Sequence, residues 1–152
     1  NIRFTGGGNG PYYGIGKKSQ SPLSLFYLMA LISHPILEAI VRIRSSSFRG
    51  AYYSHGKQFI EGLPIKLIDP ISHRENSLYQ QINEIVPKII DGKRKLSLVQ
   101  TPQQRKIKEI QVKQYRQDLN EAINVLYGFT DSDMEAVKEE NLFYAPISKE
   151  KE

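Results

Sequence analysis

The residues after Pro70 constrain the fold most strongly, because glycine becomes rare there and apolar residues recur every three or four positions. Spacing of this kind is typical of one face of an α-helix. The apolar positions form two stripes, Leu78, Ile82, Ile85 and Ile89 in the first and Val112, Tyr115, Leu119, Ile123 and Leu126 in the second. The pattern predicts a helix that Pro87 bends and that Asp91-Gly92 ends, and a longer helix over 104–127 that stops at Gly128. We expect the two stripes to pack together as a helix–helix seam.

A third, shorter helix is predicted after this pair. Residues 130–133 (Thr-Asp-Ser-Asp) provide an N-cap with an acid three residues on, which favours a helix over 134–139. A tail over 141–152 follows, which is charged over 148–152. Residues 70–140 are therefore expected to form a helical spacer or docking region.

The first 68 residues have a different pattern, in which glycine, aromatic and polar residues alternate with short apolar runs. Residues 1–5 are expected to end a β-strand, and residues 50–60 to form a strand pair or an irregular strand. Between them, Ser21-Pro22 is a favourable helix start, the apolar positions of 23–31 are expected to face a sheet, and Pro35 either ends that helix or opens a second one. The predicted fold class is α+β and helix-rich: a small mixed α/β recognition part (1–68) followed by a helical hairpin or bundle (70–140) and the tail (141–152).

The charge distribution suggests a polyanionic partner. The first sixty residues contain seven Lys or Arg against one acid, Glu38, whereas positions 61–152 contain 14 basic and 15 acidic residues. On this division the net charge of +5 belongs to the N-terminal part. Because two Gly/Tyr-rich segments are interleaved with these charges, the pattern favours nucleic acid as the partner.

The candidate DNA-binding residues lie in and around those two segments. Tyrosine side chains could stack on or hydrogen-bond to nucleic acid, Lys and Arg could contact phosphates or base edges, and His or amide groups could contact bases. The set comprises Arg3, Tyr12, Tyr13, Lys17, Lys18, Arg49, Tyr52, Tyr53, His55, Lys57 and Gln58. Alternatively, one tyrosine of each pair faces the core, and His55 and Gln58 hydrogen-bond their own loop.

Several function classes are disfavoured by composition. The chain has no cysteine, and its three histidines are scattered, so neither a disulfide framework nor a zinc site is expected. The glycine run lacks the spacing of a phosphate-binding loop or a dinucleotide fingerprint, and Glu38 alone cannot form a catalytic acid pair. The apolar run over 23–32 is too short to span a bilayer, and no signal peptide is visible. We therefore expect a cytoplasmic, non-enzymatic chain that is a fragment of a larger protein, with no metal or cofactor of its own.

The order of segments resembles a known family. GGGNGPYYGIG, then LSLFYLMALISHPILEAIVRIRSS, then FRGAYYSHGKQFIEGLPI, and finally DLNEAINVLYGFTDSDMEAV are similar to the C-terminal specificity region of adenine-specific type II restriction-modification enzymes and DNA methyltransferases, the TaqI-like family. The resemblance implies a target-recognition domain that reads duplex DNA and positions a methyltransferase domain of the same parent chain. That catalytic domain would flip an adenine and use S-adenosylmethionine. The Asn-Pro-Pro-Tyr-type motif and the cofactor glycine motif are both missing here, so the resemblance implies the recognition part alone.

Two further hypotheses stay open at this point. The chain could be a helical docking or dimerisation element, or a specificity-subunit fragment of a multi-subunit restriction system, with a homodimer through Leu119 and Ile123 of the second stripe. It could also be an enzyme in its own right. Steep salt dependence of DNA binding is expected for the leading hypothesis. Solution mass would reveal the dimer, and methyl transfer by the isolated chain would establish the enzyme.

Overall fold

The computed structural model describes residues 16, 19–45, 47–48, 52–53 and 55–142. These residues belong to two compact units that interleave along the chain. One, here called the hairpin unit, comprises residues 21–34 and 65–130, and the other, the small unit, is built chiefly from described residues of 35–64 and 131–142. Each unit has its own helices and is described separately.

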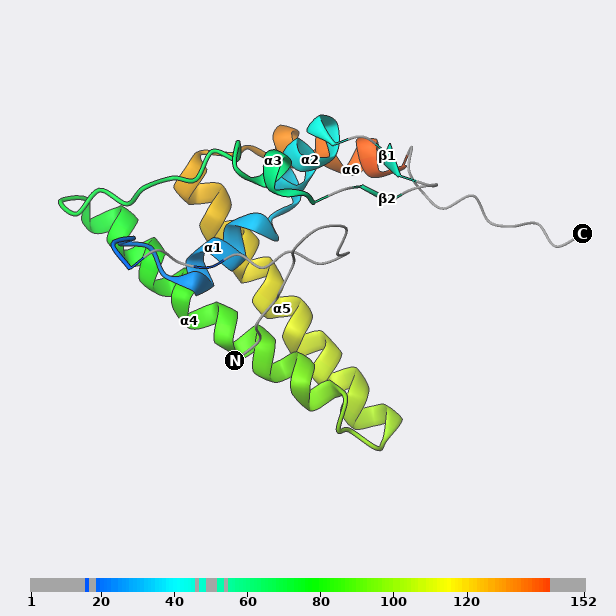
Figure 1. Cartoon of the computed structure of the whole chain (residues 1–152). Coiled ribbons are helices and arrows are strands. Elements are labelled where there is room, and N and C mark those ends of the chain that lie inside the picture. The colour runs from blue at the N-terminus through cyan, green and yellow to red at the C-terminus, as the bar shows by residue number, and fades with distance from the viewer. Residues whose placement is uncertain (1–15, 17–18, 46, 49–51, 54, 143–152) are drawn as a thin grey trace, which may run out of the picture. The chain divides into compact units, whose positions relative to one another are not determined.

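The hairpin unit consists of two long helices with a short one packed on them. Helices α4 (His73–Leu96) and α5 (Pro102–Tyr127) lie side by side, and α1 (Leu25–Ile32) packs against α4 (Figure 1). The seam between the long helices buries apolar residues from both, namely Ile82, Ile85, Val86, Val112, Leu119, Ala122, Ile123 and Leu126. The helical hairpin predicted from the two stripes is therefore confirmed.

Polar residues at the helix ends explain where these helices begin and stop. The Ser72 hydroxyl accepts a hydrogen bond from the Glu75 amide (3.2 Å), and the Thr101 hydroxyl accepts one from the Gln104 amide (3.4 Å). Each bond satisfies one of the amides that have no partner in the first turn of a helix. Gly128 ends α5 with φ of 75°, a left-handed conformation that glycine adopts without steric cost, so the predicted stop is confirmed.

The predicted end of the first long helix at Asp91-Gly92 is wrong, because α4 continues to Leu96. Gly92 lies inside the helix at a close approach of α5. A Cβ atom added there would lie 2.6 Å from Cγ2 of Val112. Glycine at this position therefore allows close helix packing, and it does not end the helix.

Helix α1 also differs from its prediction. Its N-cap is Ser24, not Ser21, and the Ser24 hydroxyl accepts a hydrogen bond from the Tyr27 amide (3.0 Å). Two side chains of α4 hold this cap, since Tyr79 accepts from the Ser24 amide (2.9 Å) and Asn83 binds the Ser24 hydroxyl. The buried face of α1 consequently packs on a helix, whereas the sequence predicted a sheet.

The small unit overturns the predicted α+β fold class. Its described part contains the helices α2 (Pro35–Arg44), α3 (Lys57–Ile60) and α6 (Asp131–Leu142). Strands β1 (Ser47–Phe48) and β2 (Tyr52–Tyr53) pair antiparallel over two residues each, so among the described residues they are the whole sheet. Because a two-stranded hairpin buries little apolar surface, the fold rests on helix packing, and α2 contacts α3 and α6.

The strand pair predicted over 50–60 is wrong in its second half, where residues 57–60 form α3. Pro35 is the first residue of α2, which resolves the alternative left open at that position. The strand predicted over residues 1–5 lies outside the described residues. Helix α6 is longer than the predicted 134–139 at both ends.

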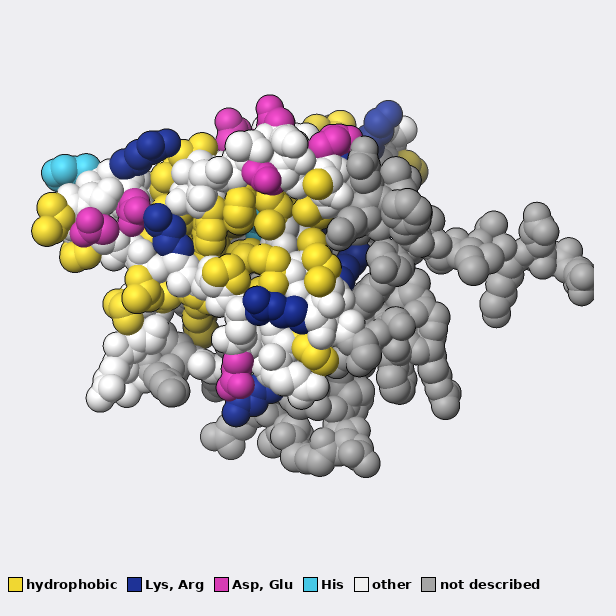
Figure 2. Space-filling model, turned by 90° about the horizontal axis from the view of Figure 1, so that it is seen from above, with side chains coloured by type: hydrophobic (Ala, Val, Ile, Leu, Met, Phe, Trp, Pro, Cys, Tyr) yellow, Lys and Arg dark blue, Asp and Glu magenta, His cyan; other side chains and the backbone are white. Residues whose placement is uncertain are grey.

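Exposed apolar side chains remain in the described structure, among them Leu25, Phe26 and Met29 of α1. On the face shown in Figure 2, hydrophobic side chains lie among charged ones of both signs. In the described ranges no single helix is long and apolar enough to cross a membrane, and only α1 and α2 taken together as a bent pair have the required length and composition.

Candidate nucleic-acid interface

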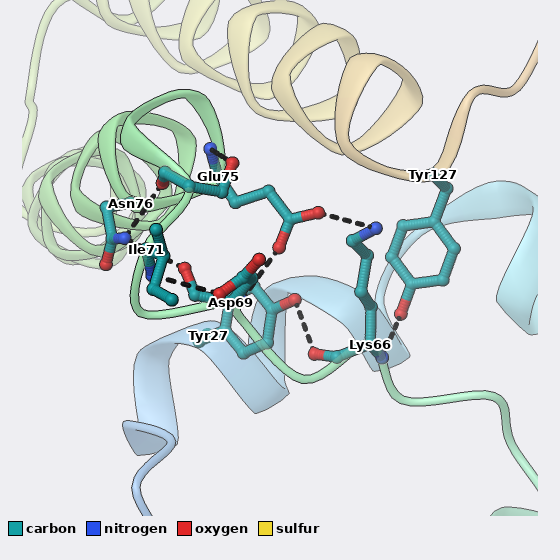
Figure 3. A network of polar contacts seen from close by, with 8 residues as sticks. Tyr27, Lys66, Asp69, Ile71, Glu75, Asn76 and Tyr127 are labelled. Carbon is teal, nitrogen blue, oxygen red and sulfur yellow. Dashed lines mark hydrogen bonds and ion pairs between the residues drawn. The ribbon is translucent and has the colours of Figure 1, made fainter.

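A polar network at one end of the hairpin unit fixes the segment that leads into α4 (Figure 3). The Tyr27 hydroxyl donates to the Lys66 carbonyl (3.0 Å), and the Lys66 amide donates to the Tyr127 hydroxyl (2.9 Å). Burial is the main cause that raises the pKa of both Tyr27 and Tyr127. Both phenols therefore stay protonated and serve to clamp the chain.

Glu75 completes the network. Its carboxylate lies 2.9 Å from Nζ of Lys66 and accepts the Asp69 amide at 2.9 Å. The Asp69 amide, followed by the Lys66 ammonium, lowers the pKa of Glu75. Because these groups pair with one another, we assign the network a structural role.

His34 is a buried titratable group in the same unit. It is fully buried and stacks on Phe129 with ring centroids 5.6 Å apart. Burial lowers the pKa of His34, and the nearby Asn124 amide and Asn120 backbone offset only part of this effect. The folded chain consequently holds His34 in its neutral form.

We expect the protein to lose stability as the pH falls below about 6.5, the ordinary pKa of histidine, because the unfolded chain then binds a proton that folded His34 does not. The stability that neutral His34 contributes is fully present above that pH. It decreases as the pH falls toward the lowered pKa of His34 in the folded chain, by at most about 1.4 kcal/mol per pH unit. His34→Phe removes the effect and keeps the ring stacking. Urea unfolding at two pH values checks it, with His73→Gln, at the exposed start of α4, as the control. Equal pH dependence in wild type and His34→Phe would contradict the assignment.

The structure describes only part of the set of DNA-binding residues predicted from sequence. Arg3, Tyr12, Tyr13, Lys17, Lys18 and Arg49 lie outside the described residues. Tyr52 and Tyr53 are described only through the backbone of β2. The side chains of His55, Lys57 and Gln58 are described, and all three are exposed.

Two of these three side chains are paired with acids inside the small unit. Nε2 of His55 lies 2.8 Å from Oε2 of Glu38, whose other oxygen lies 3.0 Å from Nε of Arg42. Nζ of Lys57 lies 3.3 Å from Oε1 of Glu61. An anionic ligand would have to compete with these carboxylates, so the described part of this surface offers less positive charge than its sequence indicated.

A stronger positive surface occurs at the far end of the α4–α5 hairpin. Residues 88–116, here called the basic hairpin end, contain nine Lys or Arg and two acids, a net charge of +7 against +5 for the whole chain. The nine are Lys88, Lys93, Arg94, Lys95, Arg105, Lys106, Lys108, Lys113 and Arg116. Counting residues 61–152 together concealed this excess because acids on either side cancel it. A running charge count over about thirty residues would have found it.

The cations of the basic hairpin end are largely without acid partners. Only Lys95 forms an ion pair with another described residue, with Nζ 2.7 Å from Oδ2 of Asp91. Lys108 donates to the neutral amide of Gln111 (2.9 Å) and is partly exposed, and the other eight cations are exposed. Arg105, Glu109 and Lys113 have the four-residue spacing of helix ion pairs on α5, but their side chains form no ion pair with one another.

Helix stability accounts for only some of these charges. Lys93, Arg94 and Lys95 lie in the last turn of α4, where cations interact favourably with the helix dipole. Arg105 and Lys106 lie near the start of α5, where cations are unfavourable, and the first turn of α5 contains no acid. The positive charge at the start of α5 therefore costs stability, which favours a role in binding an anionic partner.

No group of three or more His, Asp or Glu side chains among the described residues is arranged to hold a metal ion. No family model, curated protein or solved structure matches this chain.

Proposed function

We propose that this chain is a duplex-DNA recognition module and that the basic hairpin end holds the DNA backbone. The observation that carries the proposal is that eight of the nine cations at that end have no acid partner among the described residues. Unpaired Lys and Arg groups gain most from binding phosphate, because each neutralised phosphate releases condensed counterions from the DNA. Phosphate contacts of this kind set position and orientation, and they do not read sequence.

The remaining parts of the proposal follow from the resemblance. Base reading belongs to the predicted set that includes Arg3, Tyr12 and Arg49, and the parent would be an adenine-specific DNA methyltransferase of the restriction-modification type. In that arrangement the methyltransferase domain, with S-adenosylmethionine, is a partner within the parent chain, and this chain alone is not an enzyme. A module of this kind works where the DNA is, so we place it in the cytoplasm.

An anisotropy titration with a labelled duplex tests the proposal. Log K is expected to fall linearly with log salt between about 50 and 200 mM, and the triple variant Arg94→Gln/Lys113→Gln/Arg116→Gln is expected to make the slope shallower by about 0.9 for each phosphate that is no longer neutralised. Lys138→Gln is the matched control, because Lys138 lies on α6 and already pairs with Glu135 (3.0 Å). Absence of binding at low salt, or an unchanged slope in the triple variant, would refute the proposal.

One observation favours a docking role as the second candidate. Ile107 and Ile110, three residues apart on α5, are 58% and 59% exposed. Leu119 and Ile123, the positions expected to support a dimer, are buried within the chain's own hairpin. A dimer through the helical part would therefore use the exposed isoleucines, and the solution mass of Ile107→Gln/Ile110→Gln compared with wild type distinguishes this case.

A further inference from the structure

A small hollow lies between α4 and α5 within the basic hairpin end. It has a volume of about 240 Å³, and its lining includes Lys88 and Lys95 from α4 and Lys108, Gln111 and Tyr115 from α5. Lys95 and Lys108 also line a neighbouring hollow of about 670 Å³ beside the loop that joins the helices. Lys95 and Lys108 therefore line both hollows.

Helical spacing explains why these residues meet. Lys88, Asp91 and Lys95 are separated by three and four residues, so they lie on one face of α4 over two turns, about 10 Å of helix. Lys108, Gln111 and Tyr115 follow the same spacing on α5. Gly92 and Val112, which also line the hollow, are the point of close approach between the helices.

The hollow has an excess of positive charge. Three lysines line it against one carboxylate, and that carboxylate, Asp91, is paired with Lys95. The side chain of Lys88 has no ion pair or hydrogen bond with another described residue, and that of Lys108 binds only the neutral Gln111 amide. An ammonium group is a compact charge with three donors, so two such groups from different helices, next to an amide and a phenol, fit a tetrahedral anion.

A purely structural explanation covers only one of the three lysines. The four-residue spacing of Asp91 and Lys95 is an ordinary helix-stabilising pair. Lys88 and Lys108 make no such pair. Binding of an anion in the hollow would give both ammonium groups a partner.

We propose that this hollow, the Lys88–Lys108 pocket, binds a phosphate group. We assign this phosphate to the DNA backbone, an assignment that rests on the proposed function. The pocket would then fix the hairpin at one phosphate, while the surrounding cations contribute less localised attraction.

NMR of the full chain tests the pocket with two probes at constant ionic strength, inorganic phosphate and a short duplex. We expect inorganic phosphate to shift the Gly92 amide and the Tyr115 ring signals saturably in wild type and in the control Lys138→Gln, whose residue lies on α6 and is not part of the pocket lining. Lys88→Gln/Lys108→Gln is expected to abolish these shifts, and Lys88→Arg/Lys108→Arg to retain them. In the duplex titration the Gln variant should bind roughly eightfold more weakly at 0.1 M salt for each phosphate that it no longer neutralises.

The outcomes separate this inference from the proposed function. If duplex binds with the steep salt slope but neither Gly92 nor Tyr115 responds, or if the Gln variant binds like wild type, the pocket is refuted and DNA binding stands. If inorganic phosphate shifts both signals and duplex does not bind, the phosphate pocket stands and the proposed function fails. Shifts that persist in the Gln variant would place the anion elsewhere and overturn the inference.

Discussion

Replacement of Arg105 and Lys106 by glutamate is expected to raise the unfolding temperature of the chain and, in the same protein, to lower its affinity for duplex DNA. Both residues lie near the N-terminal end of α5, where the helix dipole disfavours cations and favours acids. The reversal at Arg105, in the first turn, should stabilise the helix by about 0.3–1 kcal/mol at low ionic strength, and the reversal at Lys106, just beyond that turn, should contribute less. On the proposed function each of these cations neutralises one phosphate, so their removal should weaken binding by about 60-fold at 0.1 M salt, and repulsion by the new acids would add to this.

The experiment is informative because stability is expected to rise while DNA affinity falls. A variant that bound poorly because it was unfolded would show lower stability as well as lower affinity. Thermal unfolding followed by circular dichroism gives the first quantity, and duplex titration by anisotropy gives the second. Gln103→Glu is the matched control, since it adds an acid to the same helix end and keeps both cations. We expect this control to gain stability with a much smaller loss of affinity. Higher stability with unchanged affinity in the double variant would remove the start of α5 from the interface.

The helical hairpin could be predicted from sequence because its determinants are local. Apolar positions at helical spacing define each buried stripe, and Gly128 adopts a left-handed conformation that marks the helix end. Position 92 is also a glycine, but it lies inside α4 and does not end the helix. Its role depends on Val112, which is distant in sequence and reaches it only when the hairpin forms.

The helix start near Ser24 shows the same limit. Ser21 and Ser24 are both suitable N-caps, and Pro22 favours the first. The choice is made by Tyr79 and Asn83, which bind the backbone and side chain of Ser24 from α4. Contacts between distant segments therefore shift a boundary that local preference would place elsewhere.

The predicted α+β fold class was wrong for a related reason. Alternating aromatic and polar residues over 50–60 are typical of strands, but β1 and β2 pair over only two residues each, and residues 57–60 turn into α3. A strand needs partners, and local alternation cannot supply them. Of the candidate DNA-binding residues, those before Tyr52 lie outside the described residues and remain a prediction, whereas the basic hairpin end was missed because the charges were summed over too long a segment.

Ile123→Ala is expected to lower the free energy of unfolding by about 2–5 kcal/mol, the usual range for removing a buried isoleucine side chain beyond its β-carbon. Ile123 is 0% exposed, on the helix that packs along α4 within one chain. The loss should therefore be the same at low and high protein concentration, as measured by urea unfolding. Val125→Ala on the same helix, where the side chain is 43% exposed, is the control and should cost much less. An unfolding midpoint that rises with protein concentration in wild type and becomes constant in Ile123→Ala would instead mean that this seam joins two chains, because only an association between chains couples stability to concentration.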